Sequence, residues 1–332
     1  MGVPADGAVR LFHGRADGVD GLVIERFGRV LFVQTFEGRL RVDEAVLRAA
    51  AERAMALAGA TAVYRKFFAE DRSAALAAVE AVHRERRPWI GEAGEEEFEI
   101  VENGLRFGIR PYDGYSVGLF LEQRENRRRV RELAAGRDVL NTFAYTCGFS
   151  VAAAAGGARS VTSVDVSGRY LDWGRRNLKR NGFEVEGVGE KGAAGGQVDV
   201  EKRPAGGRDD KQAGGRRFTF IKSDVLEYLR RAERQGREFD LIVLDPPTFG
   251  RDKKSRAVFS LASDLPRLVA GAAGRLRAGG LVLLTVNHRG TRVGDLERLL
   301  RAGGVEVVER PGLPGDFAGD AEFSKGVWGR AK

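Results

Sequence analysis

The sequence of 332 residues contains one cysteine, Cys147, and three histidines at positions 13, 83 and 288. A single cysteine excludes an intrachain disulfide and a cysteine metal cluster, and scattered histidines disfavour a zinc site. No metal site is therefore predicted. The sequence also lacks any apolar run close to the ~18 residues that a membrane helix needs. Residues 1–10 contain no basic segment followed by an apolar run, so we expect no signal peptide and a cytoplasmic location.

Basic residues outnumber acidic ones, giving a net charge of +8 and an isoelectric point near 9.8. Such an excess favours phosphate-rich partners such as RNA, because binding releases counterions. An arginine-rich composition shared by a whole proteome produces the same excess, so the charge supports an RNA partner without proving one. Hydrophobic residues make up 43% of the chain, which is enough for a sizeable core. The oligomeric state does not follow from composition.

The N-terminal third of the chain is expected to form a small unit and a connector. Residues 9–90 have the pattern of a small α/β domain, with a hairpin over 22–33 and a helix over 42–57. Residues 91–121 are predicted to connect this domain to the rest through a second hairpin over 98–110, which turns at Asn103-Gly104.

From residue 122 to 332, helical segments alternate with short apolar strands. The expected strands are 138–141, 160–164, 218–221, 241–244 and 281–285. This alternation predicts a doubly wound, Rossmann-like α/β domain with a parallel sheet, and a ligand at the carboxyl ends of its strands. The Gly-rich segment 185–217 interrupts the pattern. We interpret it as a flexible insertion, a spacer in preference to an RNA-contacting loop.

The first of these strands leads into a turn of small residues and then an Ala-rich helix at 150–155, which places backbone N–H groups beside a ligand. The turn lacks the Gly-x-Gly-x-x-Gly pattern, so a dinucleotide is disfavoured. Asp165 ends the next strand, where a carboxylate accepts hydrogen bonds from ribose hydroxyls; the alternative is a cap on the following helix. Asp224 is expected to accept from an adenine amino group or to cap the helix at 225–235, and the two roles are compatible.

The segment Asp-Pro-Pro-Thr-Phe at 245–249 follows the apolar strand 241–244. Two prolines hold the backbone extended and stiff. The segment is therefore suited to aim the Asp245 carboxylate and nearby carbonyls at a substrate amine, with Phe249 stacking on a base. The alternative is a rigid exit from the strand with Phe249 in the core.

Several segments together resemble the bacterial large-subunit rRNA methyltransferases. The resemblance rests on residues 17–28, 118–124, 141–149, 164–167, 223–225 and 245–249, which read DGVDGLVIERFG, GLFLEQR, NTFAYTCGF, VDVS, SDV and DPPTF. It covers about residues 12–330, apart from the insertion, and implies S-adenosylmethionine as cofactor. The implied cofactor contacts are Phe120, Gln123, Arg124, Asn141, Thr142, Phe143, Tyr145, Gly148, Asp165, Val166, Asp224, Val225 and Asp245.

Two chemistries occur within that family. Methylation of cytosine carbon needs a cysteine thiolate, but Cys147 lies in the cofactor loop and residues 284–290 contain no cysteine. A guanine ring nitrogen needs mainly alignment with the methyl group. The segments 245–249 and 287–290 (Asn-His-Arg-Gly) resemble the guanine-N7 branch, as do 316–318 and Trp328, whereas 319–326 depart from it.

These arguments predict catalytic and substrate-binding residues. The catalytic set is Asp245, Pro246, Pro247 and Phe249, and the proposed RNA contacts are Lys253, Lys254, Asn287 and Arg289. His288 is either a base or an exposed loop histidine. A cluster of basic residues over 251–256 is favoured as the RNA surface over a second cluster of arginines at 124–131, which has the pattern of a solvated helix face.

Two other functions compete with an rRNA methyltransferase. One is a methyltransferase that acts on a small molecule or a protein, and it predicts no salt-dependent affinity for RNA. The other is a non-catalytic RNA-binding protein, which would need a damaged cofactor loop or a damaged Asp-Pro-Pro segment, and both look intact.

Overall fold

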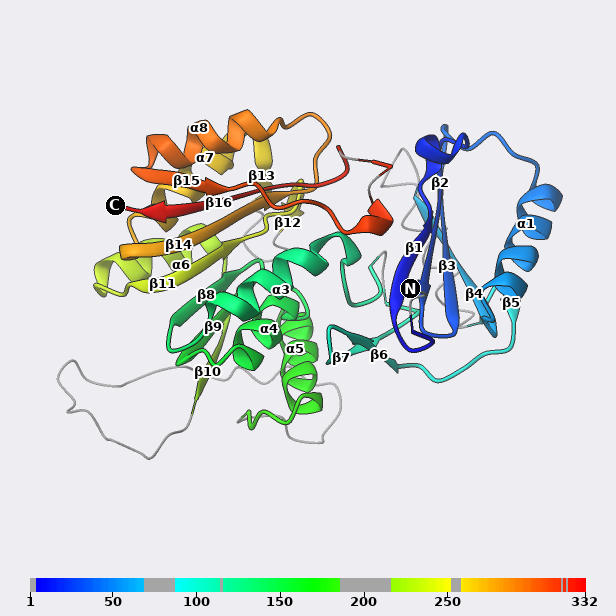
Figure 1. Ribbon diagram of the computed structural model, residues 1–332, viewed down its shortest axis with the longest axis horizontal. Coiled ribbons are helices and arrows are strands. Elements are labelled where there is room, and N and C mark those ends of the chain that lie inside the picture. Colours follow the sequence, from blue (N-terminus) through cyan, green and yellow to red (C-terminus); the bar gives the residue numbers. More distant parts are fainter. Residues whose placement is uncertain are drawn as a thin grey trace.

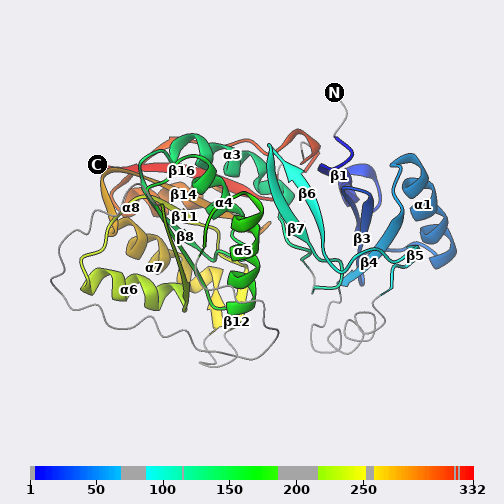
Figure 2. The same cartoon turned by 90° about the horizontal axis from the view of Figure 1, so that it is seen from below.

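The computed structural model describes residues 4–68, 87–113, 116–185, 216–251, 258–317, 319–320 and 322–332. A large α/β unit and a smaller unit lie side by side, with a hairpin between them (Figure 1, Figure 2). Lys253, Lys254 and most of the predicted insertion lie outside the described residues. Within the described part, no helix is long and apolar enough to span a membrane.

The large unit is built on a seven-stranded sheet in the order β10-β9-β8-β11-β14-β16-β15. Its strands are β8 (Asp138–Thr142), β9 (Ser160–Asp165), β10 (Arg217–Lys222), β11 (Phe239–Leu244), β14 (Leu276–Val286), β15 (Val305–Glu309) and β16 (Lys325–Ala331). The strands β8, β9, β10, β11 and β14 are parallel, and β16 is antiparallel to both of its neighbours. The five predicted strands and the doubly wound class are confirmed, whereas the prediction did not include β15 and β16.

Helices cover both faces of this sheet (Figure 2). One layer contains α3 (Arg124–Leu133), α4 (Gly148–Ala155) and α5 (Gly168–Arg180), and the other contains α6 (Val225–Arg234), α7 (Leu261–Ala273) and α8 (Val293–Ala302). Alternate residues of β11 face the two layers: Leu241 and Val243 pack with the first, Ile242 and Leu244 with the second. A strand buried on both faces is a continuous apolar run, which explains why the sequence predicted it.

The smaller unit is a five-stranded sheet in chain order, flanked by α1 (Glu44–Leu57). Its strands are β1 (Ala8–Phe12), β2 (Leu22–Phe27), β3 (Val30–Phe36), β4 (Ala62–Phe68) and β5 (Ile90–Gly91). Both predicted elements, the hairpin and the helix, are confirmed. The prediction missed β1 and β4 because charged residues interrupt their apolar pattern. Arg10 of β1, for example, is buried through an ion pair with Glu25 (2.7 Å).

The connector contains the predicted hairpin, β6 (Phe98–Glu102) and β7 (Leu105–Ile109). Asn103 and Gly104 have φ of 51° and 76°, as a two-residue hairpin turn requires. Phe107 of this hairpin shares one apolar core with Phe32 of the small sheet and Val151 of α4. The small unit and the large unit are therefore packed together through the hairpin.

Candidate active site

The parallel strands of the large sheet end along one edge, and the order of the chain reverses between β8 and β11. In a doubly wound sheet, the crevice at such a reversal is where ligands bind. The loops that follow β8, β9, β11 and β14 all leave from this edge. The predicted cofactor and substrate segments are thus brought to one side of the molecule.

The loop after β8 has an unusual backbone. Phe143, Tyr145 and Cys147 all have positive φ, between 47° and 62°, a conformation that costs a non-glycine residue free energy. Tertiary hydrogen bonds hold it, including one from Ala144 N to Val164 O (3.0 Å). The loop leads directly into α4, so its backbone amides lie at a helix N-terminus.

Asp165 joins this loop to the loop after β9. Its carboxylate accepts from Tyr145 N (2.9 Å) and from Ser167 N (2.8 Å). Burial raises its pKa in spite of these two donors. Ser167 is the N-cap of α5, its hydroxyl accepting from Tyr170 N (3.4 Å). Each Asp165 oxygen still has a lone pair for a further donor.

Two large apolar side chains are exposed beside these loops. Phe120 and Val166 are each 39% exposed. The Phe120 ring lies 5.3 Å from the ring of Tyr145, and Val166 directly follows Asp165. An apolar surface next to a hydrogen-bonding carboxylate is the combination that a nucleoside requires.

Asp224 is the N-cap of α6, which confirms one of its two predicted roles. Its carboxylate accepts from Glu227 N (2.9 Å) at the start of α6, and Val225 is buried in the first turn. The predicted contact of Asp224 with adenine stays a prediction.

Several predicted cofactor residues are engaged inside the protein. Asn141 and Thr142 are buried, donating to Ser150 Oγ (2.8 Å) and Val243 O (2.8 Å). Gly148 is the first residue of α4, and a Cβ there would come within 3.2 Å of Leu119. A cofactor contact at these positions would have to use the backbone.

Gln123 and Arg124 connect parts of the chain that are far apart. Gln123 Nε2 donates to Thr285 Oγ1 (3.0 Å) at the end of β14. Arg124 donates to Asp316 Oδ1 (2.7 Å) and to the carbonyl of Ala8 (2.9 Å). The Arg124 guanidinium therefore holds β1 of the small unit against the C-terminal segment, and its predicted contact with the cofactor stays a prediction.

Asp245 directly follows β11, between the ends of β8 and β14. Its side chain is half-buried. Burial and, to a smaller extent, the negative charge of Glu122 raise the pKa of the Asp245 carboxyl to about 7. No described residue donates a hydrogen bond to its carboxylate. Pro246 is buried and Pro247 exposed, and Phe249 begins β12 (Phe249–Arg251), which pairs with β13 (Val258–Ser260).

Glu122 is a site residue that the sequence analysis did not select. It lies in the 3₁₀ helix η2 (Leu121–Gln123), is 5% exposed, and has a pKa raised by burial. Asn287 Nδ2 donates to its Oε1 (3.2 Å). In the sequence, Glu122 is an acidic residue that directly follows the apolar run Leu119-Phe120-Leu121. Its role becomes visible only because η2 lies against the end of β14.

Asn287, His288 and Arg289 are exposed in the loop after β14. The prediction that His288 is an exposed loop residue is confirmed. Its Nδ1 lies 2.9 Å from Thr291 Oγ1. Arg289 forms a two-pronged ion pair with Asp320. RNA would have to compete with Asp320 for the Arg289 guanidinium.

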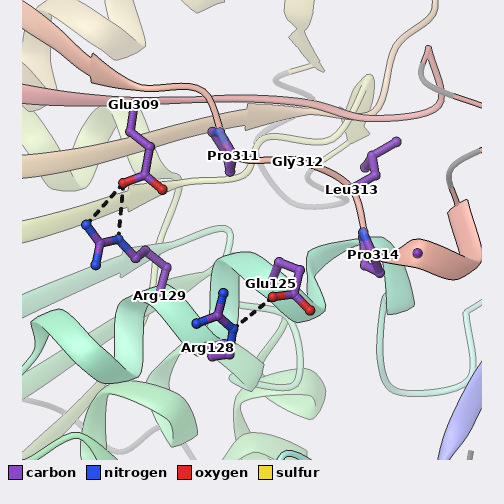
Figure 3. Close-up of a pocket in the computed structure, with 9 residues that line it drawn as sticks. Glu125, Arg128, Arg129, Glu309, Pro311, Gly312, Leu313 and Pro314 are labelled. Atoms are coloured by element: carbon purple, nitrogen blue, oxygen red, sulfur yellow. Dashed lines mark hydrogen bonds and ion pairs between the residues drawn. The ribbon is translucent and has the colours of Figure 1, made fainter. Parts of the chain in front are cut away.

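The arginines of α3 are paired within the protein. Arg127 forms a buried two-pronged pair with Glu102 (2.7 and 2.8 Å). Arg128 and Arg129 line a cavity of about 330 Å³ together with segment 311–315, and each faces a glutamate there (Figure 3). These local pairs support the interpretation of this cluster as a helix face and not as an RNA surface.

Cys147 is fully buried, and burial raises the pKa of its thiol to about 12. A thiol with this pKa is almost entirely protonated near neutral pH and is a poor nucleophile. Among the described residues, no group of three or more His, Cys, Asp or Glu side chains could hold a metal ion.

Comparison with known proteins agrees with this geometry. The sequence profile of a family described as S-adenosylmethionine-dependent methyltransferase matches residues 9–197. The chain belongs to this family. Its members use S-adenosylmethionine (SAM), the cofactor that the sequence predicted. The matched segment includes most of the small unit, the hairpin and the loops after β8 and β9, which are predicted to bind the cofactor.

Individual relatives support the same family. Ribosomal RNA large subunit methyltransferase K of Neisseria meningitidis is 35% identical over 227 residues, covering 68% of this chain and 55% of that protein. Ribosomal RNA large subunit methyltransferase K/L of Pseudomonas paraeruginosa is 36% identical over 220 residues, covering 66% and 25%. The chain thus spans about half of the first relative and a quarter of the second.

The fold has a counterpart among solved structures. A structure solved in complex with SAH aligns over 98% of this chain and 76% of its own, with a TM-score of 0.76 and 24% identity. At this identity the likeness supports the fold, including the small N-terminal unit as well as the large sheet.

Proposed function

We propose that this protein transfers the methyl group of SAM to a base in large-subunit rRNA, with a ring nitrogen of guanine, N7, as the favoured acceptor. The observation that carries the proposal is the open, half-buried carboxyl of Asp245, which follows β11 at the edge where the cofactor loops converge. The names of the two relatives support an rRNA substrate, and the net charge of +8 agrees with it. The cytoplasm is the proposed compartment.

The residues at the edge of the sheet fit the cofactor. Asp165 has lone pairs for ribose hydroxyls, and the exposed Phe120 and Val166 offer apolar faces to a purine. The backbone amides at the start of α4 suit a carboxylate. Bound SAM supplies an electrophilic methyl group.

Ring-nitrogen chemistry suits the residues present better than carbon chemistry does. Carbon methylation of cytosine needs a thiolate that adds to the ring, and the one cysteine is buried with a pKa of about 12. Guanine N7 has a lone pair that is already nucleophilic. Holding it in line with the methyl group supplies about 7–11 kcal/mol, so no strong base is required.

In this proposal, the carboxylate of Asp245 and the carbonyls of Pro246 and Pro247 hold the base, and Phe249 stacks on it. Asn287 and Arg289 contact the base or a phosphate. Lys253 and Lys254 bind the flanking RNA backbone. Reversing both lysine charges should weaken RNA binding and reduce the salt slope by about 2. An unchanged slope would remove these lysines from the RNA surface.

The test is methyl transfer from isotopically labelled SAM to unmodified large-subunit rRNA, followed by nucleoside mass analysis. We expect N7-methylguanosine. Label in 5-methylcytidine would overturn the argument from Cys147. If the protein binds SAM, as measured by calorimetry on the same sample, but transfers no methyl group to RNA, the result would favour a small molecule or a protein as substrate. The Asp245→Asn variant serves as the control for background transfer.

A further inference from the structure

A short chain of hydrogen bonds joins η2 to the loops that follow β11 and β14. Thr248 Oγ1 donates to the backbone carbonyl of Asn287 (3.0 Å), and Asn287 Nδ2 donates to Glu122 Oε1 (3.2 Å). Glu122 is 5% exposed, whereas Asn287 is exposed. A buried carboxyl group thus holds an amide that faces the surroundings.

Glu122 determines which atom of the Asn287 amide a ligand meets. The Asn287 NH₂ group donates to Glu122 Oε1, so the amide oxygen Oδ1 is directed away from this carboxyl group. No described residue donates to Asn287 Oδ1. Asn287 therefore presents an acceptor, although its side chain also contains a donor.

Asp245 provides a second open acceptor close by. It directly follows Leu244, which pairs with Leu284 of β14, three residues before Asn287. Thr248 ties the two loops together through its bond to the Asn287 carbonyl. Two oxygen acceptors without described donors therefore lie at the ends of neighbouring strands.

We propose that Glu122 is a positioning residue that, through Asn287, completes a two-acceptor edge selecting guanine. On its Watson–Crick edge, guanine has two adjacent donors, N1–H and the 2-amino group, whereas adenine and cytosine each have an acceptor ring nitrogen beside their one amino donor. Uracil has one N–H between two carbonyls. A base held by this edge has N7 free on the opposite side of its ring. This inference rests on the proposed function and explains how its target base is chosen.

The first test uses RNA in which the target nucleotide, once mapped, is guanosine, inosine or 2-aminopurine riboside. Inosine lacks the 2-amino group, and 2-aminopurine lacks N1–H. The wild type should lose about 10- to 100-fold in kcat/KM on each analogue. Asn287→Ala should lose discrimination against one of the two, with SAM affinity unchanged. If both wild-type ratios survive in Asn287→Ala, the two-acceptor edge is wrong.

The second test separates positioning from direct contact. Glu122→Gln keeps the shape, but an amide both donates and accepts, so the orientation of Asn287 is no longer fixed. This variant should weaken the same discrimination, and the double variant should lose no more than Asn287→Ala alone. Additive losses would overturn the positioning role. His288→Ala, a change in the adjacent exposed side chain, is the matched control and should keep both ratios.

These outcomes are distinguishable from a failure of the proposed function. If the wild type methylates no RNA, the proposed function fails. If it methylates RNA on a base other than guanine, the rRNA methyltransferase survives and the two-acceptor edge is overturned.

Discussion

The two halves of the site differ in how their carboxyl groups are hydrogen-bonded. In the half formed by β8 and β9, the carboxylate of Asp165 accepts from two backbone amides of the loops that it joins. In the half formed by β11 and β14, the carboxyl of Asp245 has no described donor and lies near the buried Glu122. In the first arrangement, the two backbone donors offset part of the cost of burying the carboxylate, although burial still raises the pKa of Asp165. The second leaves hydrogen-bonding capacity for the substrate, at a cost in stability.

The largest expected effect is on Asp245. Asp245→Asn should reduce methyl transfer by on the order of 100-fold, because a charged acceptor is lost. It should also stabilise the protein above neutral pH. The pKa of Asp245 is raised from 3.8 to about 7, so wild-type stability falls as pH rises through this interval, with an upper bound of about 4 kcal/mol. Asparagine has no such penalty.

Urea unfolding of wild type and Asp245→Asn at pH 5 and pH 8 measures this directly. The variant should exceed the wild type in stability by more at pH 8 than at pH 5, because the wild type loses stability as pH rises from 3.8 to about 7. An equal stability difference between variant and wild type at both pH values would mean that the pKa of Asp245 is not raised. The two halves of the site would then not differ in this respect.

The next effect tests the rigidity of the cofactor half. A Cβ at Gly174 of α5 would lie 2.2 Å from Cys147 Sγ, so Gly174→Ala should destabilise the protein by about 3 kcal/mol through overpacking. Cys147→Ala should recover part of the loss in the double variant. Gly294→Ala is the control, because nothing lies within 4 Å of its Cβ. Equal denaturant midpoints for the two glycine variants would contradict tight packing around this loop.

A similar or smaller effect is expected for Asp165 in cofactor binding. Asp165→Ala should weaken SAM binding by about 1.5–3 kcal/mol, the range for hydrogen bonds to a charged group. Calorimetry gives the dissociation constant, and an unaltered value would rule out the ribose contact. Asp165→Asn keeps acceptor capacity on one atom and should have the smaller effect of the two.

The smallest effect is expected on α3. Arg128→Ala should change stability by less than about 1 kcal/mol, because its ion pairs with Glu125 and Glu132 are exposed. It should leave the salt slope of RNA binding unchanged. A slope lowered by about 1 would show that this helix contacts phosphate after all.

Many of the strands, turns and helix caps could be predicted from the sequence, and some could not. The apolar runs of β11 and β14 and the turn at Asn103-Gly104 were found because their patterns are local. The strands β1 and β4 were missed because charged residues within them are buried by partners elsewhere in the chain, as Arg10 is by Glu25. The cap formed by Asp224 was predictable from its place before a helix.

By itself, the sequence determined the doubly wound class, the loops predicted to bind the cofactor and the position of Asp245 after a buried strand. These follow from periodicity and from residues adjacent in the chain. Only the tertiary structure decided which side chains meet at the edge of the sheet. Glu122 and Asn287 are 165 residues apart, and Arg124 meets Asp316 across 192. Such pairs form because separate segments pack at the ends of neighbouring strands, and no local pattern records that packing.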